Sequence, residues 1–481
     1  MLNPDSTSSG DAIAGAPHSE GASSPTGDER LRAIPPVSAI VSEAKRLGSE
    51  LAEDALTRTA RAELEDVRQT LLAGEKLDRP EIERRVIDAI AALERPRLAA
   101  VLNATGVVIH TNLGRAPVSP ETAEAMRAAA AHPVPLEIDR ESNERGGRMR
   151  EVAGLLRALT GAESALVVNN CASAVLLVLA AVASGKDVVV SRGEAVEIGG
   201  GFRVPDVLRQ SGARLVEVGT TNRTYARDYA AATTEETGAY LKVHPSNFRA
   251  FGFVHSASTA ELVVLAREHG LPVLEDLGSG ALLDTSRFGL APEPTLTGAI
   301  AAGADLVMAS ADKLLGGPQG GIIVGSAPWV ERVARHPLAR AVRADKTALA
   351  GIATTLRHYL GGEAESRVPI WRMIAEPESA IRVRATHLAA ALEQDGLAAD
   401  VEPVHATVGG GSLPGETIPS WAVVLSPAVG EGVDTLARRL RLGDPGVFGR
   451  VDRDRLVLDL RTVLPEEDEI LLRSLRHSLG A

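Results

Sequence analysis

A lysine followed by a glycine-rich loop is the residue whose surroundings most favour covalent chemistry. The apolar stretch 305–309 leads into Ser310-Ala-Asp-Lys313 and then into Leu-Leu-Gly-Gly-Pro-Gln-Gly-Gly. An amine at the end of a strand, beside backbone that can approach closely, is suited to forming a Schiff base with a carbonyl cofactor. A loop lysine is ordinarily only a solvated charge. Lysine is scarce here, however, and the six residues stand at positions 45, 76, 186, 242, 313 and 346.

A carboxylate ends the apolar stretch that precedes this one. Residues 271–275 run into Asp276-Leu-Gly-Ser-Gly280, and the sequence between Asp276 and Lys313 has room for one helix and one strand. Pyridoxal phosphate needs a carboxylate against its ring nitrogen, because the ring is an effective electron sink only when that nitrogen stays protonated. We therefore expect Asp276 and Lys313 on nearby strand ends, although Asp276 alone is equally typical of a helix cap or turn.

An anion site is predicted where another strand meets a helix. Residues 164–168 run into Asn169-Asn170-Cys171-Ala172-Ser173 and then into an apolar helix at 172–183. Free backbone N–H groups and the positive end of the helix dipole bind phosphate at such a start, and Asn170 and Ser173 can add side-chain donors. We expect Cys171 to pack or to offer its backbone N–H, as Ala172 does. A phosphate cradle, a ring carboxylate and a Schiff-base lysine in this order indicate a pyridoxal-phosphate enzyme of the aspartate-aminotransferase-like fold.

The chain divides by composition into four parts. Residues 1–34 are rich in Ser, Gly, Ala and Pro and predict a disordered tail, and 35–98 carry apolar residues at helical spacing and predict a helical bundle. Between 99 and 362, short β-branched runs alternate with helical stretches, which is typical of an α/β catalytic domain with a mostly parallel sheet. Residues 363–481 predict a small C-terminal α/β domain.

Composition excludes several classes of protein. The 481 residues carry a net charge of -12, which gives no global electrostatic reason to expect a nucleic acid partner. The single cysteine excludes an internal disulfide framework and fits a reducing compartment. The apolar run 172–183 is shorter than the roughly 20 residues that a membrane span needs, so we expect a cytoplasmic protein.

Arginines gather in three places despite the acidic total. They are Arg115, the loop Glu144-Arg-Gly-Gly-Arg-Met-Arg150, and the segment 331–346, which contains five basic and two acidic residues. Arginine forks bind oxyanions such as phosphate with two hydrogen bonds. We expect Arg340 and Arg343 to share one side of a helix and bind such a group, whereas Arg332 and Arg335 are typical of a solvated helix face.

Five longer stretches identify a family. They are Asn103-Ala-Thr-Gly-Val-Val-Ile-His-Thr-Asn-Leu-Gly-Arg115, Ser191-Arg-Gly-Glu-Ala-Val-Glu197, Arg209-Gln-Ser-Gly-Ala-Arg-Leu-Val-Glu-Val-Gly-Thr-Thr-Asn-Arg223, Lys242-Val-His-Pro-Ser-Asn247 and Asp312-Lys-Leu-Leu-Gly-Gly-Pro-Gln319. From about residue 34 to the C-terminus the chain resembles the bacterial selenocysteine synthases, the L-seryl-tRNA(Sec) selenium transferases. Two positions depart from the family pattern. Cys171 stands where a third asparagine is common, and Ala311 replaces a frequent glycine.

The resemblance implies a complete activity. Lys313 matches the lysine that holds pyridoxal phosphate, and Arg115, Arg340 and Arg343 match basic positions that bind the selenium donor, selenophosphate. The helices of 35–98 resemble a domain that binds the selenocysteine tRNA by its shape. The family converts the seryl group on that tRNA to a selenocysteinyl group through an aminoacrylyl intermediate. Its members form a homodecamer, a ring of dimers.

The residues also allow other interpretations. A pyridoxal-phosphate lyase that eliminates from a small amino acid or a phosphorylated amino sugar would share Lys313, Asp276 and the phosphate loop, but it needs no tRNA-binding domain. A non-catalytic RNA-binding protein on the same fold is disfavoured, because every candidate cofactor group is present. Arg192 and Glu194 either cover the cofactor ring or form a salt-linked turn.

Overall fold

The computed structural model describes residues 31–95, 98–198, 201–428 and 430–480. The chain separates into two compact units, Met1–Ala99 and Ala100–Ala481. Residues 1–30 of the expected disordered tail lie outside the described residues. Among the helices that the structure describes, none combines the length and the apolar character that crossing a membrane requires.

Among the described residues of the N-terminal unit, three helices have bounds that can be given. They are α2 (Val37–Arg46), α3 (Glu53–Leu72) and α4 (Arg79–Glu94). On α3 the buried positions Leu56, Ala60, Leu64, Val67 and Leu71 recur at intervals of three or four residues, so one face of the helix joins a single apolar core. The start of α4 is fixed by a capping box, in which Asp78 accepts from the Glu81 backbone N–H and Glu81 accepts from that of Asp78.

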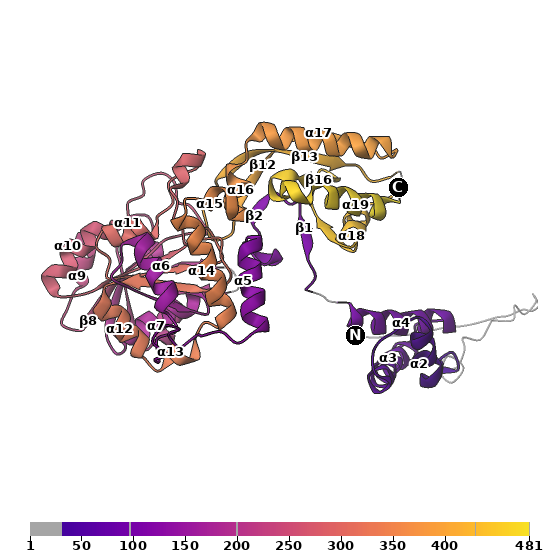
Figure 1. Ribbon diagram of the computed structural model, residues 1–481, viewed down its shortest axis with the longest axis horizontal. Helices are drawn as coiled ribbons and strands as arrows, with labels where there is room; N and C mark the ends of the chain where they lie inside the picture. Colours follow the sequence, from indigo (N-terminus) through magenta and orange to yellow (C-terminus); the bar gives the residue numbers. More distant parts are fainter. Residues whose placement is uncertain (1–30, 96–97, 199–200, 429, 481) are drawn as a thin grey trace, which may run out of the picture. The chain divides into compact units, whose positions relative to one another are not determined.

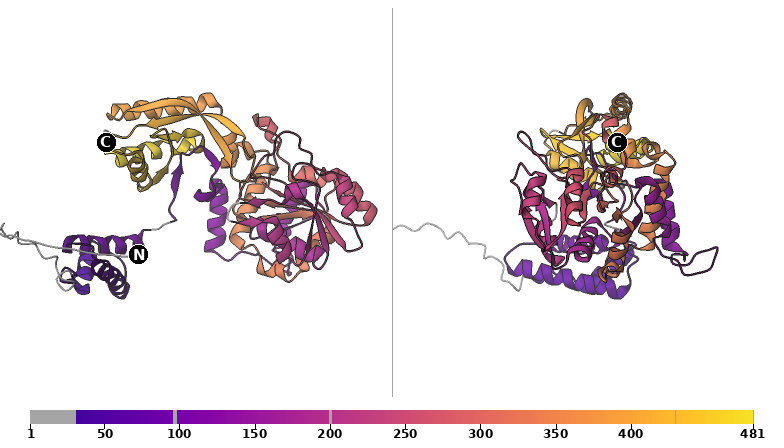
Figure 2. Two further views of the ribbon diagram at one scale, coloured as in Figure 1. Left: turned by 180° about the vertical axis from the view of Figure 1, so that it is seen from behind. Right: turned by 90° about the vertical axis from the view of Figure 1, so that its left-hand side faces the viewer.

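A seven-stranded sheet forms the body of the second unit (Figures 1 and 2). All neighbouring pairs are parallel except those made by β11, which runs antiparallel between β10 and β3. The expected mostly parallel sheet is therefore confirmed. In spatial order the strands are β3 (Ser164–Val168), β11 (Gly321–Gly325), β10 (Leu306–Ser310), β9 (Val273–Gly278), β8 (Thr237–Val243), β4 (Asp187–Ser191) and β7 (Arg214–Val218).

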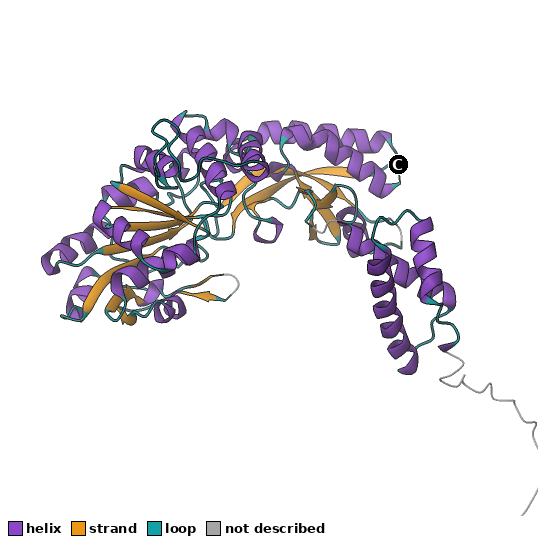
Figure 3. Cartoon of the chain, turned by 60° about the horizontal axis from the view of Figure 1, so that its bottom comes forward, coloured by secondary structure: helices purple, strands orange, loops and turns teal. Residues whose placement is uncertain are grey.

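Helices cover both faces of this sheet, as Figure 3 shows. One face packs against α7 (Cys171–Ala183), α8 (Val204–Gln210) and α12 (Ala327–Arg335). The other packs against α6 (Arg150–Thr160), α9 (Ala226–Ala232), α10 (Thr259–His269), α11 (Leu296–Ala301) and α14 (Lys346–Leu360). The other elements around the sheet are η1 (Thr111–Leu113), α5 (Pro120–Ala131), η2 (Arg192–Glu194), β5 (Glu197–Ile198), β6 (Phe202–Arg203), η3 (Thr285–Phe288), α13 (Leu338–Ala341), α15 (Ala364–Arg367) and α16 (Pro369–Ala375).

A second sheet forms the C-terminal part and has the order β15-β16-β13-β12-β2. Its core receives side chains from three helices. The elements are β12 (Ala399–Gly409), β13 (Thr417–Leu425), β14 (Gly446–Phe448), β15 (Arg450–Asp452), β16 (Arg455–Asp459), η4 (Leu460–Thr462), η5 (Pro465–Glu467), α17 (Glu378–Gln394), α18 (Val433–Arg441) and α19 (Asp468–Leu479).

Two strands from early in the chain belong with these late elements. β1 (Val101–Asn103) pairs with β14, and β2 (Val107–Ile109) pairs in parallel with β12. The sequence placed residues 101–109 in the part that spans 99–362, and the structure differs. The pairing joins residues about 300 positions apart, which no local pattern reveals.

Candidate active site

The ends of β9 and β10 bring Asp276 and Lys313 to the same edge of the large sheet. The strands are parallel, and Asp276 pairs with Met308. A bulge follows, because Ala309 pairs with Gly278 and leaves Leu277 as the extra residue. After the strands, the Leu314 N–H donates to the Ser279 carbonyl at 2.9 Å, which ties the lysine loop to the aspartate loop.

Burial sets the protonation of this site. Asp276 is 5% exposed and Lys313 is 7% exposed. Burial raises the pKa of Asp276, and the positive charge of Lys313 opposes that rise. Burial and the Asp276 carboxylate together raise the pKa of the Cys171 thiol. Cys171 therefore stays protonated, and its Sγ lies 3.7 Å from Asp276 Oδ1 as a weak donor. It is not a nucleophile in this setting.

The contact between Cys171 and Asp276 joins the predicted phosphate cradle to the Asp276 carboxylate, since Cys171 is the first residue of α7. Asn170 caps that helix, with its side-chain oxygen accepting from the Ser173 backbone N–H at 2.8 Å. The cap leaves the amide nitrogen of Asn170 to offer a ligand. A Cβ on Gly321 would lie 2.2 Å from the Asn170 carbonyl oxygen, so β11 can pass this loop closely only with glycine there.

Two buried hydroxyl groups near Lys313 have no hydrogen-bond partner among the described residues: Ser246 Oγ and Ser279 Oγ. A Cβ built on Gly278 would lie 3.3 Å from Ser246 Oγ and 3.8 Å from Lys313 Nζ, so the amine and this hydroxyl share one small space. Buried polar atoms are rarely left unsatisfied. These atoms, the Asp276 carboxylate and the amine fit a polar ligand bound between β9 and the start of α7.

Asp312 links Arg115 to the lysine loop. Arg115 Nη1 donates to Asp312 Oδ2 at 2.9 Å, and Asp312 Oδ1 accepts from Ser310 Oγ at 2.7 Å. Asp312 is buried, whereas Arg115 is about one-third exposed. The structure thus brings Arg115 to the loop that carries Lys313. The sequence analysis did not predict this contact. The available signal was an acidic residue, Asp312, directly before the candidate lysine.

Arg340 and Arg343 lie elsewhere, and not on one helix. α13 ends at Ala341. After it, the Val342 carbonyl accepts from the Asn169 N–H at 2.9 Å, and the backbone of Arg343 forms an isolated antiparallel β-bridge with Val168. Both arginines line a cavity of about 580 Å³ with Arg145 and Arg148. The structure therefore brings the pair to the loop that precedes α7. Arg115 is not part of this cavity.

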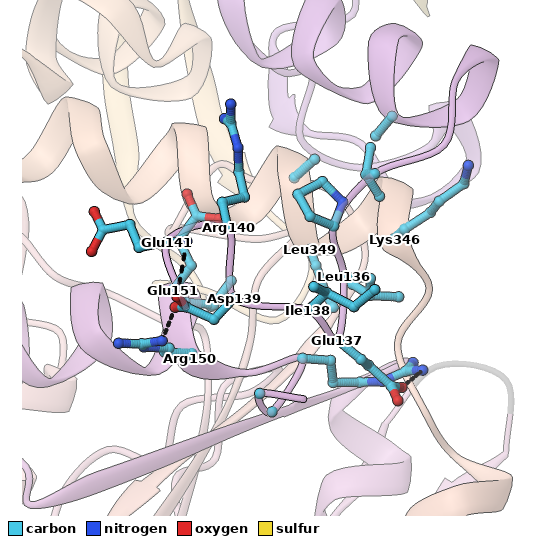
Figure 4. Close-up of a pocket in the computed structure, with 18 residues that line it drawn as sticks. Leu136, Glu137, Ile138, Asp139, Arg140, Glu141, Arg150, Glu151, Lys346 and Leu349 are labelled. Atoms are coloured by element: carbon cyan, nitrogen blue, oxygen red, sulfur yellow. Dashed lines mark hydrogen bonds and ion pairs between the residues drawn. The ribbon is translucent and has the colours of Figure 1, made fainter. Parts of the chain in front are cut away.

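Carboxylates neutralise most of the other arginines in this region. Arg148 donates to Glu137 at 2.6 Å. Arg150 forms an ion pair with Asp139, and both line a cavity of about 550 Å³ between the 134–141 loop and α14 (Figure 4). Among the described residues, neither Arg340 nor Arg343 has a carboxylate within ion-pair distance. This pair is thus left to attract an anion.

Glu194 and Arg192 form a salt-linked turn. Glu194 is buried and accepts from Lys242 Nζ at 2.9 Å, from Ser256 Oγ at 2.7 Å and from the Val243 N–H at 3.0 Å. Arg192 lies 3.6 Å from Glu217. The Glu194 carboxylate thus accepts three hydrogen bonds from the protein itself. This favours a salt-linked turn over a role at the cofactor ring.

The chain is similar to a set of selenium transferases. Residues 101–464 match the family described as L-seryl-tRNA selenium transferase. The chain is 47% identical over 449 residues to the L-seryl-tRNA(Sec) selenium transferase of Hyphomonas neptunium, a stretch that covers 90% of this chain and 96% of that protein. The corresponding protein of Moorella thermoacetica is 49% identical over 404 residues, covering 83% of this chain and 85% of that protein.

A solved structure of D-glucosaminate-6-phosphate ammonia-lyase superposes with a TM-score of 0.54 at 23% identity. The match covers 81% of this chain and 97% of that chain. At this identity the likeness shows the fold alone. Together with the strand order of the large sheet, it confirms the predicted aspartate-aminotransferase-like architecture.

We predict that Asp276→Asn stabilises the protein without cofactor at neutral pH, by on the order of 1 kcal/mol. Because burial raises the pKa of Asp276, its ionised form lowers the free energy of unfolding. In strong acid, below the ordinary value of 3.8, the carboxyl is protonated in both states and the two proteins should be equally stable. The advantage of the variant should appear as pH rises through that value and level off above the raised pKa.

Urea unfolding of the two proteins across this pH range measures the difference. Asp284→Asn is the control, since Asp284 is exposed and its contacts with Ser286 lower the pKa of its carboxyl. Its effect should have the opposite sign. An Asp276→Asn variant that is no more stable than the original at pH 7 would contradict the prediction.

Proposed function

This chain belongs to the L-seryl-tRNA selenium transferase family, and from that premise we propose that it converts seryl-tRNA(Sec) to selenocysteinyl-tRNA(Sec) with selenophosphate as selenium donor. Identity of 42–49% to three such transferases, over at least 83% of the chain, supports an enzyme of the same class. The observation that carries the chemistry is the meeting of Lys313, Asp276 and the start of α7 through the Cys171 contact. The reaction balances because the serine hydroxyl leaves as water and a water molecule cleaves the donor's Se–P bond, which releases phosphate.

Pyridoxal 5'-phosphate is the proposed cofactor, and the residues present fit it. Lys313 would hold it as a Schiff base and Asp276 would accept from its ring nitrogen. Asn170, Cys171, Ala172 and Ser173 would bind its phosphate at the start of α7. The unpartnered hydroxyls of Ser246 and Ser279 support a polar occupant. Bound there, the cofactor supplies an electron sink for a carbanion at the seryl Cα.

The chain's own residues then carry the protons and exclude water. Lys313, once its amine is free, is the base for the proton on the seryl Cα. Its burial, with that of Asp276, keeps water from the reacting atoms. The β-hydroxyl leaves as water with the proton removed from Cα, and an aminoacrylyl group remains on the tRNA. The selenium of selenophosphate adds to its β-carbon while a proton returns to Cα, and water then cleaves the Se–P bond to release phosphate.

The proposed donor site uses two arginines that have no carboxylate partner among the described residues, together with Arg115. Arg340 and Arg343 share a cavity beside the loop that leads into α7, and their forks suit a phosphate group. Arg115 reaches the lysine loop separately through Asp312. We propose that all three bind selenophosphate, with Arg115 at the end nearest the amine.

We predict that Arg343→Ala lowers selenium transfer by on the order of 100-fold, because one charge-assisted fork to the donor is lost. The cofactor's absorbance should be unchanged. The assay is incorporation of radioactive selenium from selenophosphate into purified seryl-tRNA(Sec). Lys313→Ala should abolish both signals, and borohydride reduction followed by peptide mapping should label Lys313 in the original chain. Arg127→Ala, at an exposed position of α5 outside this cavity, is the matched control. Full activity of Arg343→Ala would refute the donor role, and label on another lysine would refute the cofactor assignment.

The N-terminal helices are the proposed tRNA-binding domain. Exposed arginines stand on two of them, at Arg58, Arg61 and Arg68 of α3 and at Arg84 and Arg85 of α4. Such residues provide phosphate contacts in a chain whose total charge is negative. Shape recognition of this kind leaves no short sequence motif.

Deleting residues 1–98 should abolish binding of the selenocysteine tRNA and leave the cofactor's absorbance intact, because residues from Ala100 onward form a compact unit of their own. A gel-shift with selenocysteine tRNA against serine tRNA measures the loss. Deletion of residues 1–30 alone is the control and should bind tRNA normally. Unchanged affinity after the longer deletion would remove the proposed role of these helices.

An assembly of several copies, a homodecamer built as a ring of dimers, is proposed from the family. Three of the six phenylalanines are exposed in one short loop: Phe248 at 43%, Phe251 at 78% and Phe253 at 82%. Arg249 and Arg223 stack on Phe251 and Phe253. Clustered exposed aromatic rings are typical of a surface that another protein covers, and a second copy of this chain fits the proposal.

Phe251→Asp should therefore reduce the assembly to smaller species, because a carboxylate in a buried apolar contact is unfavourable. Light scattering after size-exclusion chromatography measures the mass. Leu442→Asp, at a position that is 67% exposed beyond α18, is the matched control and should leave the mass unchanged. An unaltered mass for Phe251→Asp would exclude this loop from the interface.

A lyase acting on a small amino acid or a phosphorylated amino sugar is the second candidate. It is supported by the fold shared with D-glucosaminate-6-phosphate ammonia-lyase, at 23% identity. The higher identity to selenium transferases favours tRNA as substrate. The proposed substrate and the single cysteine are both consistent with the cytoplasm.

A further inference from the structure

A turn of the C-terminal sheet reaches the amine of Lys313. Residues 410–416 connect β12 to β13, and Gly411 in this turn has a φ of 82°. A Cβ built on Gly411 would lie 2.4 Å from Lys313 Nζ, 2.8 Å from Cε and 3.3 Å from Cδ. Carbon atoms in ordinary contact are roughly 3.5–4.0 Å apart. The backbone of Gly411 therefore lies directly against the outer half of the lysine side chain.

We propose that this turn is a positioning element for Lys313, and that the missing side chain at position 411 determines where the amine rests. The inference deepens the proposed function and rests on it, because it concerns the residue that would hold the cofactor. Gly411 acts through Lys313 and touches neither the donor nor the tRNA in this proposal.

The turn is held firmly enough to set a position. At its start, Gly409 pairs with Ile109, and a Cβ on Gly409 would lie 2.4 Å from the Ile109 carbonyl oxygen. Farther along, Ser412 is fully buried, and Leu413 packs into the same apolar cluster as Leu314, the residue after the lysine. One core thus holds both the turn and the lysine loop, so their separation is fixed.

Crowding at Gly411 would act on the lysine and not on the fold. The atoms that a Cβ would meet there are the end of a flexible side chain, which can rotate away, whereas the nearest atom at Gly409 is a backbone carbonyl oxygen. A larger residue at 411 should therefore leave the chain folded while displacing the amine. A displacement of about 1 Å at a reacting group can cost on the order of 100-fold in rate.

The test compares Gly411→Ala with Gly415→Ala. Gly415 lies in the same turn with a φ of 78°, and no atom lies within 4 Å of a Cβ built there. Both variants carry similar backbone strain, so only the contact with Lys313 differs. In the protein freed of cofactor, we expect Gly411→Ala to bind pyridoxal phosphate on the order of 100-fold more slowly, followed by absorbance.

A second readout needs no cofactor. Labelling by acetic anhydride, mapped by mass spectrometry, should change its rate at Lys313 in Gly411→Ala and stay constant at Lys186, an exposed lysine far from the turn in sequence. Gly415→Ala should match the original chain in both readouts. Equal behaviour of the two variants, or an original rate for Gly411→Ala, would overturn the proposal.

If Gly411→Ala is less stable than the original chain, a double-mutant cycle tests whether the contact with Lys313 is the cause. If the contact causes it, the Lys313→Ala background should restore the thermal midpoint of Gly411→Ala to that of Gly415→Ala. If the difference persists without the lysine side chain, the positioning role is excluded. Failure of the proposed function itself gives another pattern, in which pyridoxal phosphate never attaches to Lys313 of the original chain.

Discussion

The buried carboxylate of Asp276 is the constraint on which the site depends. An ionised acid in a dry environment is unfavourable, and burial raises the pKa of Asp276, yet the proposed cofactor needs it charged. The counterbalancing groups are the Lys313 charge, the Cys171 thiol and the Gly278 backbone N–H, all of which lower the pKa of that carboxyl. They come from three different segments, so the carboxylate is tolerable only when β3, β9 and β10 are in their places.

The fold could be predicted wherever local pattern decides it. Strands at 164–168, 187–191 and 214–218 agree residue for residue with β3, β4 and β7, because each is a short run rich in β-branched or apolar residues between turn residues. β11 escaped detection, since its five residues begin and end with glycine and follow directly on the glycine-rich loop. The membership of β1 and β2 in the second sheet depends on pairings far along the chain.

Some features of the site could likewise be predicted from the sequence, and others could not. Asp276 and Lys313 could be placed together because the carboxyl ends of parallel strands meet at one edge of a sheet, and their spacing in sequence fits one crossover. The ion pair of Arg115 with Asp312, the position of Arg343 beside Val168 and the approach of Gly411 could not be predicted. Each depends on loops whose course is set by three-dimensional packing and not by periodicity.

The pairing of β2 with β12 also sets an order of events during synthesis. About 300 residues separate the two strands, so at ribosomal rates β2 waits on the order of 15 to 60 seconds for its partner. The large sheet uses only residues 164–325 and can assemble in that interval. Its nascent form carries Lys313 without the turn that covers it, because that turn arrives with β12 and β13. Closure of the second sheet is therefore a late step of folding, and it completes the lysine's surroundings.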